Sequence, residues 1–255
     1  MLQLALDIGN TRCKISDGEV CRSVSHQCSG WVEELAAVVE SFRGTDSPCA
    51  WWLASVNRPV LRRVTEWLES DRPRDLLHIL NFRNIPIQID VEFPERVGVD
   101  RLLAAVTANE IRDPFRPAVV VDLGTAAKVD LVDEKGVFRG GAIAPGLRMS
   151  ALAMEQQTDA LPEVDIMEML NSMTAEEISS VGRNTQEAIR AGLFWGTVGT
   201  IRELTAQTTS GLAIPPEVYL TGGGARIIRD ALGEGFFYVD EMVMKGIRTT
   251  IRHTI

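Results

Sequence analysis

The chain has 255 residues, 45% of them hydrophobic and 24% charged, which is ordinary for a globular protein of one large or two modest domains. Its formal net charge is −9 at pH 7 and no Lys/Arg-rich run occurs, so the composition disfavours a nucleic-acid partner, whose phosphates bind clustered cations. No apolar run approaches the ~18 residues of a membrane-spanning helix and no secretory leader is recognisable, so we expect a cytoplasmic protein without a membrane partner.

Apolar periodicity predicts alternating strands and helices in the first half of the chain. Strands are predicted over residues 2–7, 12–16, 50–56, 76–80 and 85–91. Helices are predicted over residues 31–42, from 59 to about 68, and over 102–111. The helix-stopping segment Asp113–Pro117 follows, and we place the boundary between two domains there, at 1–115 and 116–255.

The second half repeats this plan. Strands are predicted over residues 118–123, 128–132, 137–139, 217–220 and 236–239. Helices are predicted over residues 147–157, 166–178, 186–208, 226–232 and 242–253, with Met149, Leu152 and Ala153 of the first turned toward the core. Glycine and proline punctuate residues 140–146, which predicts a loop that closely approaches other backbone. Small residues along 186–208 predict close helix contact, within the chain or with a second subunit.

The four cysteines lie within the first fifth of the chain, at positions 13, 21, 28 and 49. They form no Cys-x-x-Cys pair, which is the usual spacing of zinc ligands. We therefore expect reduced thiols, as is typical of a cytosolic protein, in place of a zinc site.

A short apolar strand that ends in Asp-apolar-Gly occurs twice. Val119–Val121 continues into Asp122-Leu-Gly-Thr125, and Leu4–Leu6 continues into Asp7-Ile-Gly-Asn-Thr11. Open α/β sheets bind ligands at the carboxyl ends of strands, and a glycine there lets the backbone approach the ligand. Since Walker A, Gly-x-Gly-x-x-Gly and common hydrolase motifs are missing, the pattern predicts a duplicated α/β fold with two phosphate-binding turns. A later turn, Gly222–Gly224, is suited to lie against a nucleoside.

Asp100 and Arg101 stand at the start of the predicted 102–111 helix. Taken alone, this position favours a purely structural role for Asp100, because an aspartate at a helix start commonly caps free N–H groups. Arg101 would then lie on a solvated face.

These motifs together resemble the type III pantothenate kinases, within the superfamily of actin, sugar kinases and heat-shock-chaperone ATPases. The resemblance runs in order from residue 3 to about residue 225. It rests on Asp7-Ile-Gly-Asn-Thr11, Pro94-x-x-Val-Gly-x-Asp-Arg101, Asp122-Leu-Gly-Thr125, Gly140-Gly-Ala-Ile-Ala-Pro-Gly146, Leu161-Pro-x-Val164, Gly182-x-Asn-Thr185 and Thr221-Gly-Gly223. It implies an α/β fold of duplicated ribonuclease H-like (actin-like ATPase) domains, with mixed central sheets flanked by helices.

The resemblance also implies a reaction and its partners. The enzyme would transfer the γ-phosphoryl group of ATP to pantothenate, giving 4'-phosphopantothenate, the first step of coenzyme A biosynthesis. It would use Mg²⁺ and a monovalent cation, K⁺ or NH₄⁺, and would act as a homodimer. Phosphoryl transfer needs alignment and charge neutralisation more than covalent chemistry by the protein.

Site residues follow from the same resemblance. Asp100 would be the general base, in preference to serving only as a helix cap, and Asp122 would bind the monovalent cation. Asp7 would organise Mg²⁺ through water. The ATP-binding residues would be Asp7, Ile8, Gly9, Asn10, Thr11, Arg12, Cys13, Lys14 and Thr125. The pantothenate-binding residues would be Gly98, Val99, Asp100, Arg101 and Thr185.

One segment departs from the family, which usually continues Asp-Phe-Gly-Thr-Ala-Thr-Thr. Here the segment reads Asp122-Leu-Gly-Thr-Ala-Ala-Lys128, so two hydroxyls are lost and one cation is gained. Lys128 would either add a phosphate contact or point away as a strand residue. If its charge replaced that of the monovalent cation, activity would survive removal of K⁺ and NH₄⁺.

Two other classes of function are kept as alternatives. The first is a different small-molecule kinase on the same fold, which a substrate panel would reveal. The second is a non-catalytic relative with an accessory role in transcription. The presence of Asp7, Asp100, Arg101, Asp122 and Thr185 argues against the second.

Overall fold

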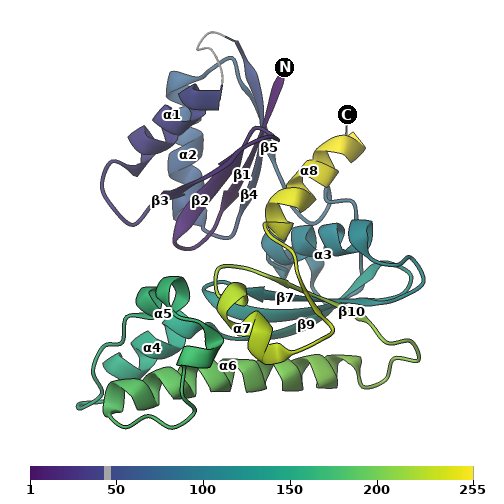
Figure 1. The fold of residues 1–255 in the computed structure, drawn as a ribbon. Coiled ribbons are helices and arrows are strands. Elements are labelled where there is room, and N and C mark those ends of the chain that lie inside the picture. Colours follow the sequence, from purple (N-terminus) through teal and green to yellow (C-terminus); the bar gives the residue numbers. More distant parts are fainter. Residues whose placement is uncertain (43–46, 255) are drawn as a thin grey trace. The chain divides into compact units, whose positions relative to one another are not determined.

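The structure is a computed structural model that describes residues 1–42 and 47–254 (Figure 1). The chain divides into two compact units. Unit 1 comprises Met1–Ile87, Glu92–Thr107 and Met242–Ile255, and unit 2 comprises Gln88–Val91 and Ala108–Glu241. The chain therefore enters unit 2 briefly at Gln88–Val91, returns to unit 1, builds the rest of unit 2, and returns to unit 1 again.

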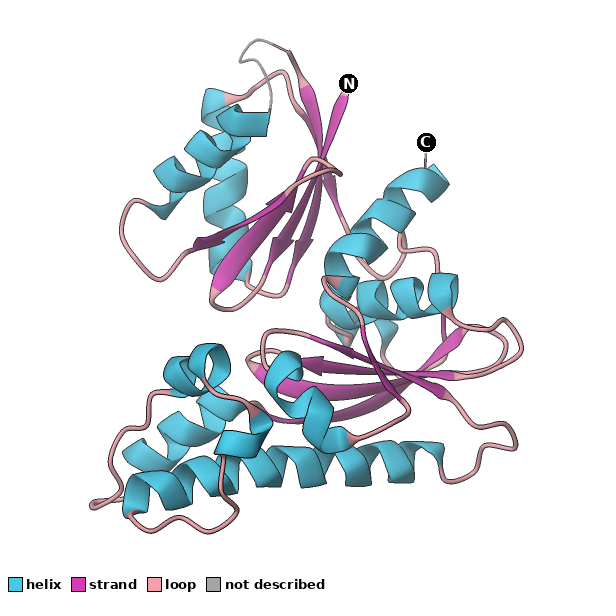
Figure 2. Cartoon of the chain, in the orientation of Figure 1, coloured by secondary structure: helices cyan, strands magenta, loops and turns pink. Residues whose placement is uncertain are grey.

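Unit 1 is built on a five-stranded mixed sheet with the order β3-β2-β1-β4-β5. Figure 2 distinguishes the helices of the chain from its strands by colour. Its strands are β1 (Leu2–Ile8), β2 (Arg12–Ser16), β3 (Cys21–Ser25), β4 (Cys49–Ser55) and β5 (Leu76–Ile79). The central strand β1 pairs antiparallel with β2 and parallel with β4. Because strand side chains alternate between faces, Leu4, Leu6 and Ile8 all point into one core.

Helices cover the sheet of unit 1. Helices α1 (Trp31–Phe42) and α2 (Arg58–Asp71) supply Trp31 and Val64, among others, to the core that contains Leu4. The side chain of Asn57 caps α2 by accepting a hydrogen bond from the N–H of Val60. The short helix η1 (Pro94–Arg96) precedes α3 (Val99–Ile111).

The last helix, α8 (Met242–Thr254), packs against β1 and β4. Its Gly246 approaches the backbone of Leu103 in α3 so closely that an added Cβ would lie 2.0 Å from the Leu103 carbonyl oxygen. The hydroxyl of Thr107 donates to the carbonyl of Met242 at 2.6 Å. These contacts join the start of α8 to α3.

Unit 2 is built on a six-stranded mixed sheet with the order β11-β10-β7-β8-β9-β6. Its strands are β6 (Gln88–Ile89), β7 (Ala118–Leu123), β8 (Ala126–Val132), β9 (Val137–Pro145), β10 (Glu217–Thr221) and β11 (Phe236–Tyr238). Its helical segments are α4 (Leu147–Gln156), α5 (Ile166–Ser172), η2 (Ala175–Glu177), α6 (Thr185–Thr209) and α7 (Ala225–Leu232). Val119, Val121 and Leu123 of β7 face the core that these helices close.

Both sheets share one topology. In each, the first strand begins an antiparallel three-stranded meander on one side and has two parallel strands on the other. Unit 2 adds β6, which pairs parallel with β9 at the edge of the sheet. Strands β1, β2, β4 and β5 of unit 1 correspond to β7, β8, β10 and β11 of unit 2. The predicted duplication of an α/β unit with a mixed sheet is therefore confirmed.

Sequence predictions are wrong at several places in unit 2. The helix predicted over residues 166–178 ends at Ser172, and the short helix η2 follows over Ala175–Glu177. Residues 140–145 belong to strand β9, where a loop was predicted, and residues 141–145 pair with β8. The expected close approach is nevertheless present, since an added Cβ at Gly141 would lie 1.9 Å from the Val129 carbonyl oxygen. In α4 the buried residues are Leu147 and Ala151, whereas Met149 and Leu152 are exposed.

The small residues of α6 divide into two groups, since Ala191 is buried, whereas three glycines border open space among the described residues. In the described part of the chain, Cβ atoms added at Gly192, Gly196 and Gly199 would meet nothing within 4 Å. Trp195, between two of these glycines, is 39% exposed. Separately, no helix among the described residues is long and apolar enough to cross a membrane.

Candidate active site

The turn that follows β1 presents backbone donors beside a carboxylate. Asp7 lies at the carboxyl end of β1 and is half-buried. The N–H of Gly9 donates to the carbonyl of Arg12 at 3.1 Å, which closes the turn. Within residues 1–42 and 47–254, the backbone N–H groups of Asn10 and Thr11 donate no hydrogen bond. Such a turn is suited to bind an anion.

Lys14 and Cys13, on the next strand, have opposite environments. Lys14 stands directly across the antiparallel ladder from Asp7, and its ammonium has no ion pair or hydrogen bond among the described residues. Cys13 faces the core, where burial, and then the charge of Asp7, raise the pKa of its thiol to about 12. Lys14 can therefore offer a charge to a ligand, whereas Cys13 can contribute only backbone groups.

Asp100 lies in the first turn of α3, and its carboxylate folds back over Gly98. Its Oδ1 accepts a hydrogen bond from the N–H of Arg101 at 2.9 Å, and the same N–H also donates to the carbonyl of Gly98 at 3.1 Å. A Cβ added at Gly98 would lie 2.6 Å from this Oδ1. Any residue larger than glycine at position 98 would therefore displace the carboxylate.

One residue links the Asp7 turn to the Asp100 segment. The N–H of Val56, just beyond β4, donates to the carbonyl of Ile8 at 3.1 Å. A Cβ at Gly98 would lie 3.8 Å from a methyl group of this same Val56. Unit 1 thus brings both predicted segments to the carboxyl-terminal edge of its sheet, where α/β folds bind ligands.

The turn after β7 is the centre of a second cluster, made of glycine segments. A Cβ added at Gly146, at the start of α4, would lie 2.5 Å from the carbonyl of Thr125. From the other side, the N–H of Gly224 donates to the carbonyl of Leu123 at 3.0 Å. The three glycine-containing segments of unit 2 therefore meet at Leu123–Thr125, although they are far apart in the sequence.

Asp122 forms an ion pair with Lys128. The two residues are direct partners in the β7–β8 ladder, and Lys128 Nζ lies 2.8 Å from Asp122 Oδ2. Their side chains are 17% and 16% exposed, respectively. Lys128 is therefore directed at the Asp122 carboxylate, a contact that neither sequence-based alternative for this lysine included.

Thr185 is the first residue of α6 and is exposed. The helix begins there because the side chain of Asn184 accepts a hydrogen bond from the N–H of Glu187 at 2.9 Å. Thr185 belongs to unit 2, as do Asp122 and Thr125, whereas all the other predicted site residues belong to unit 1.

Sequence reasoning missed three participants in these clusters, namely Val56, Gly146 as a contact of Thr125, and the partner of Asp122. The sequence did contain a signal for the partner of Asp122. The strands 118–123 and 128–132 are joined by a tight turn, and counting outward from it pairs Asp122 with Lys128. Val56 carried no such signal, because its role depends on parallel pairing between distant strands.

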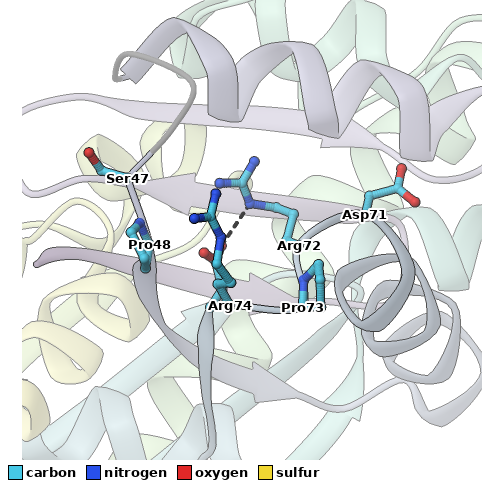
Figure 3. Close-up of a pocket in the computed structure, with 7 residues that line it drawn as sticks. Ser47, Pro48, Asp71, Arg72, Pro73 and Arg74 are labelled. Carbon is cyan, nitrogen blue, oxygen red and sulfur yellow. Dashed lines mark hydrogen bonds and ion pairs between the residues drawn. The ribbon is translucent and has the colours of Figure 1, made fainter.

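A separate surface pocket lies at the opposite end of the unit 1 sheet (Figure 3). Its lining includes Asp75, whose carboxylate accepts from the indole of Trp51 at 2.8 Å, the N–H of Cys49 at 2.9 Å, and Arg72 at 2.7 Å. Burial raises the pKa of Asp75, but these hydrogen bonds outweigh it and leave that pKa below its ordinary value. These hydrogen bonds lie at the amino ends of the parallel strands, whereas α/β folds bind ligands at the carboxyl ends. We therefore interpret the Asp75 contacts as structural.

Solved structures resemble the whole chain in their fold. A candidate Baf-family transcriptional activator from Campylobacter jejuni matches with a TM-score of 0.61 and 18% identity, over 98% of both chains. An archaeal actin homologue matches with a TM-score of 0.55 and 12% identity over both full lengths. At such identities the likeness shows the fold alone, which is that of the duplicated actin-like ATPases, as predicted.

Sequence comparison narrows this class to one family. The family described as type III pantothenate kinase matches residues 3–207. A type III pantothenate kinase of Rhodopirellula baltica is 34% identical over 91% of both chains. One of Chlorobaculum parvum is 33% identical over 98% of this chain and 94% of its own. The chain therefore belongs to the type III pantothenate kinase family, a family of ATP-dependent kinases, as the sequence motifs predicted.

Proposed function

We propose that this chain transfers the γ-phosphoryl group of ATP to a hydroxyl of pantothenate, which yields 4'-phosphopantothenate and ADP for coenzyme A biosynthesis. Its family membership supports the reaction. The single structural observation that carries the residue assignment is the clustering of the Asp7 turn and Asp100 at one edge of unit 1.

Phosphate binding is assigned to the turn between β1 and β2. The N–H groups of Asn10 and Thr11, which donate to no described residue, donate to phosphate oxygens, and the ammonium of Lys14 adds a positive charge. Thr125 adds a hydroxyl and an N–H from the corresponding turn of unit 2. The remaining residues of the first turn are Ile8, Gly9, Arg12 and Cys13, which shape its backbone.

Asp7 is suited to hold hydrated Mg²⁺, because a half-exposed carboxylate beside phosphate donors is the kind of ligand this ion takes. When bound, Mg²⁺ neutralises charge on the phosphates. Asp7 would also orient the water molecules around the ion.

Asp100 accepts the proton in the transfer step. The pantothenate oxygen forms a bond to the γ-phosphorus, the bond from that phosphorus to the bridging oxygen of ADP breaks, and the hydroxyl proton passes to the Asp100 carboxylate. Gly98 allows this carboxylate its folded-back position, in which the N–H of Arg101 holds one oxygen. Pantothenate binding is assigned to Gly98, Val99, Asp100, Arg101 and Thr185, with Arg101 suited to its carboxylate.

The test is ATP-dependent formation of phosphopantothenate, followed by mass spectrometry and by ADP release, with Mg²⁺ and K⁺ present. We expect turnover by the wild type and a loss in kcat of roughly 10²–10⁴-fold for Asp100→Asn. Asp159→Asn, an exposed site, is the matched control. Absence of product with the wild type would refute the kinase assignment, whereas a fully active Asp100→Asn would refute only the base.

We also propose that the enzyme is a cytoplasmic homodimer. The open space beside Gly192, Gly196 and Gly199 supports a second α6 packing there, because small residues let helices approach closely. Sedimentation analysis of the wild type and of Gly196→Arg tests this, with a dimer expected for the former and a monomer for the latter. A monomeric wild type at micromolar concentration would exclude the dimer.

A further inference from the structure

The Asp122 carboxylate, which the family resemblance assigns to a monovalent cation, already holds a cation of this chain. The Lys128 ammonium lies 2.8 Å from Asp122 Oδ2, and both side chains are largely shielded from water. An ammonium group and K⁺ carry the same single charge. The residues present therefore do not fit an additional monovalent ion on this oxygen, because two like charges would share one partly buried carboxylate.

The second carboxylate oxygen is enclosed as well. A Cβ added at Gly222 would lie 2.7 Å from Asp122 Oδ1, so the backbone of the glycine turn packs directly against this oxygen. On the same face, the buried Thr221 is the partner of Asp122 in the β7–β10 ladder. Among the described residues, no group of three or more His, Cys, Asp or Glu side chains is arranged to hold a metal ion.

The two departures from the family sequence have different consequences. Ala127 is 1% exposed and belongs to the core beneath the sheet, on the face opposite to Asp122. Loss of a hydroxyl at position 127 is thus a change in packing. Position 128 shares the face of Asp122, so the replacement there exchanges a hydroxyl oxygen, which can bind a cation, for the cation itself.

We propose that Lys128 is a built-in replacement for the monovalent cation, so that phosphoryl transfer by this chain requires neither K⁺ nor NH₄⁺. A tethered ammonium occupies the position at any external salt composition, and its charge stays beside the turn that carries Thr125. The inference rests on the proposed kinase function. Lys128 acts here through Asp122 and is a positioning residue, because it is not assigned a contact with the reacting atoms.

The experiment compares the wild type with Lys128→Thr, which restores the usual family residue. Rates of phosphopantothenate formation are measured with tetramethylammonium as the only monovalent cation, and again with K⁺ or NH₄⁺ at equal ionic strength. We expect a less than about twofold effect of K⁺ on the wild type, and at least about tenfold activation of Lys128→Thr. Lys135→Thr, which removes an exposed lysine in the β8–β9 turn, should behave like the wild type.

Thermal unfolding in the same two salts gives a readout that is independent of catalysis. A ligand that binds only the folded state raises Tm, so K⁺ should raise the Tm of Lys128→Thr by a few degrees and leave the wild type unchanged. Strict dependence of wild-type activity on K⁺ or NH₄⁺ would overturn the proposal, as would a K⁺-specific rise in wild-type Tm. If the wild type shows no kinase activity in either salt, the proposed function fails, and the Tm comparison alone decides whether Lys128 replaces the ion.

Discussion

The two units place an aspartate and a lysine in the same relation, yet the two pairs behave differently. Asp7 faces Lys14 across the β1–β2 ladder, and Asp122 faces Lys128 across the equivalent β7–β8 ladder. In unit 2 the pair closes into an ion pair at 2.8 Å. In unit 1 the Lys14 ammonium has no ion pair or hydrogen bond with any described residue.

Equivalent positions in a duplicated fold can therefore have different roles, one in ligand binding and the other in internal charge balance. A lysine ammonium that makes no ion pair within the protein can bind a phosphate, whereas an ammonium already paired with a carboxylate is less available to one. We therefore assign Lys14 to the nucleotide and Lys128 to Asp122. Four measurements test these different roles of the two pairs.

The enclosure of Asp122 can be broken at Gly222. Its φ of +94° and the short approach of an added Cβ to the Leu123 carbonyl make Gly222→Ala strained, and we expect a loss of about 3 kcal/mol in unfolding free energy. Urea denaturation measures it. Gly223→Ala is the control, because its Cβ would meet nothing within 4 Å in the described part of the chain. Equal losses in both variants would contradict the enclosure.

The ion pair itself predicts unequal effects on stability. Lys128→Met leaves the Asp122 carboxylate partly buried without its ammonium and should cost about 2 kcal/mol in buffer free of K⁺. Lys14→Met removes no hydrogen bond or ion pair with a described residue and should cost less than about 0.5 kcal/mol. If chemical denaturation gives the same value for both variants, the distinction between the two lysines is lost.

We expect substitution of Lys14 to lower catalytic activity, although it should have little effect on stability. Removing a charged donor to phosphate typically costs 1.5–3 kcal/mol, so Lys14→Met should lower kcat/KM for ATP by about tenfold or more. Steady-state kinetics at saturating pantothenate measure this, with Arg22→Met on the exposed face of β3 as a control. An unchanged kcat/KM would remove Lys14 from the nucleotide site.

A third aspartate, Asp75, provides a purely structural reference for the two pairs. Its pKa in the folded state lies below the ordinary value of 3.8, so the unfolded chain binds a proton more readily and stability rises with pH across that range. The contribution is complete above about pH 4 and is lost as the pH falls through the folded-state pKa.

We expect Asp75→Asn to be less stable than the wild type by about 1 kcal/mol near neutral pH, and by less in acid. Denaturation at a series of pH values tests this, with the exposed Asp71→Asn as the matched control. Kinase activity per folded molecule should not change, because Asp75 lies at the end of the sheet remote from Asp7. A stability difference that grows in acid would contradict the assignment.

Local patterns sufficed for most of the fold. The strand 12–16 and the helix 31–42 were predicted with their observed bounds, because each has a clear apolar period and a definite stop. Residues 140–145 were not recognised as strand, since their small side chains resemble a loop and only the neighbouring β8 backbone explains them. The buried face of α4 was missed because Met149 and Leu152 are apolar but exposed.

Some features of the candidate site could likewise be predicted from local sequence, and others could not. Motif resemblance indicated which residues matter, including Asp7 and Asp100, because each stands at a predictable end of a strand or helix. The partner of Lys128 required strand register, and the bridge through Val56 required pairing between β1 and β4. Such contacts join residues distant in sequence, and no local window contains them.

The return of the chain to unit 1 has a consequence for synthesis on the ribosome. Arg248 of α8 donates to the carbonyl of Gln3 and to the hydroxyl of Ser16, and Gly246 packs on Leu103. Strand β1 therefore gains its contacts with α8 only after residues 108–241 of unit 2 have been translated in between. Unit 2 can fold as it emerges, whereas the Asp7 turn acquires the support of α8 only once that helix has been synthesised.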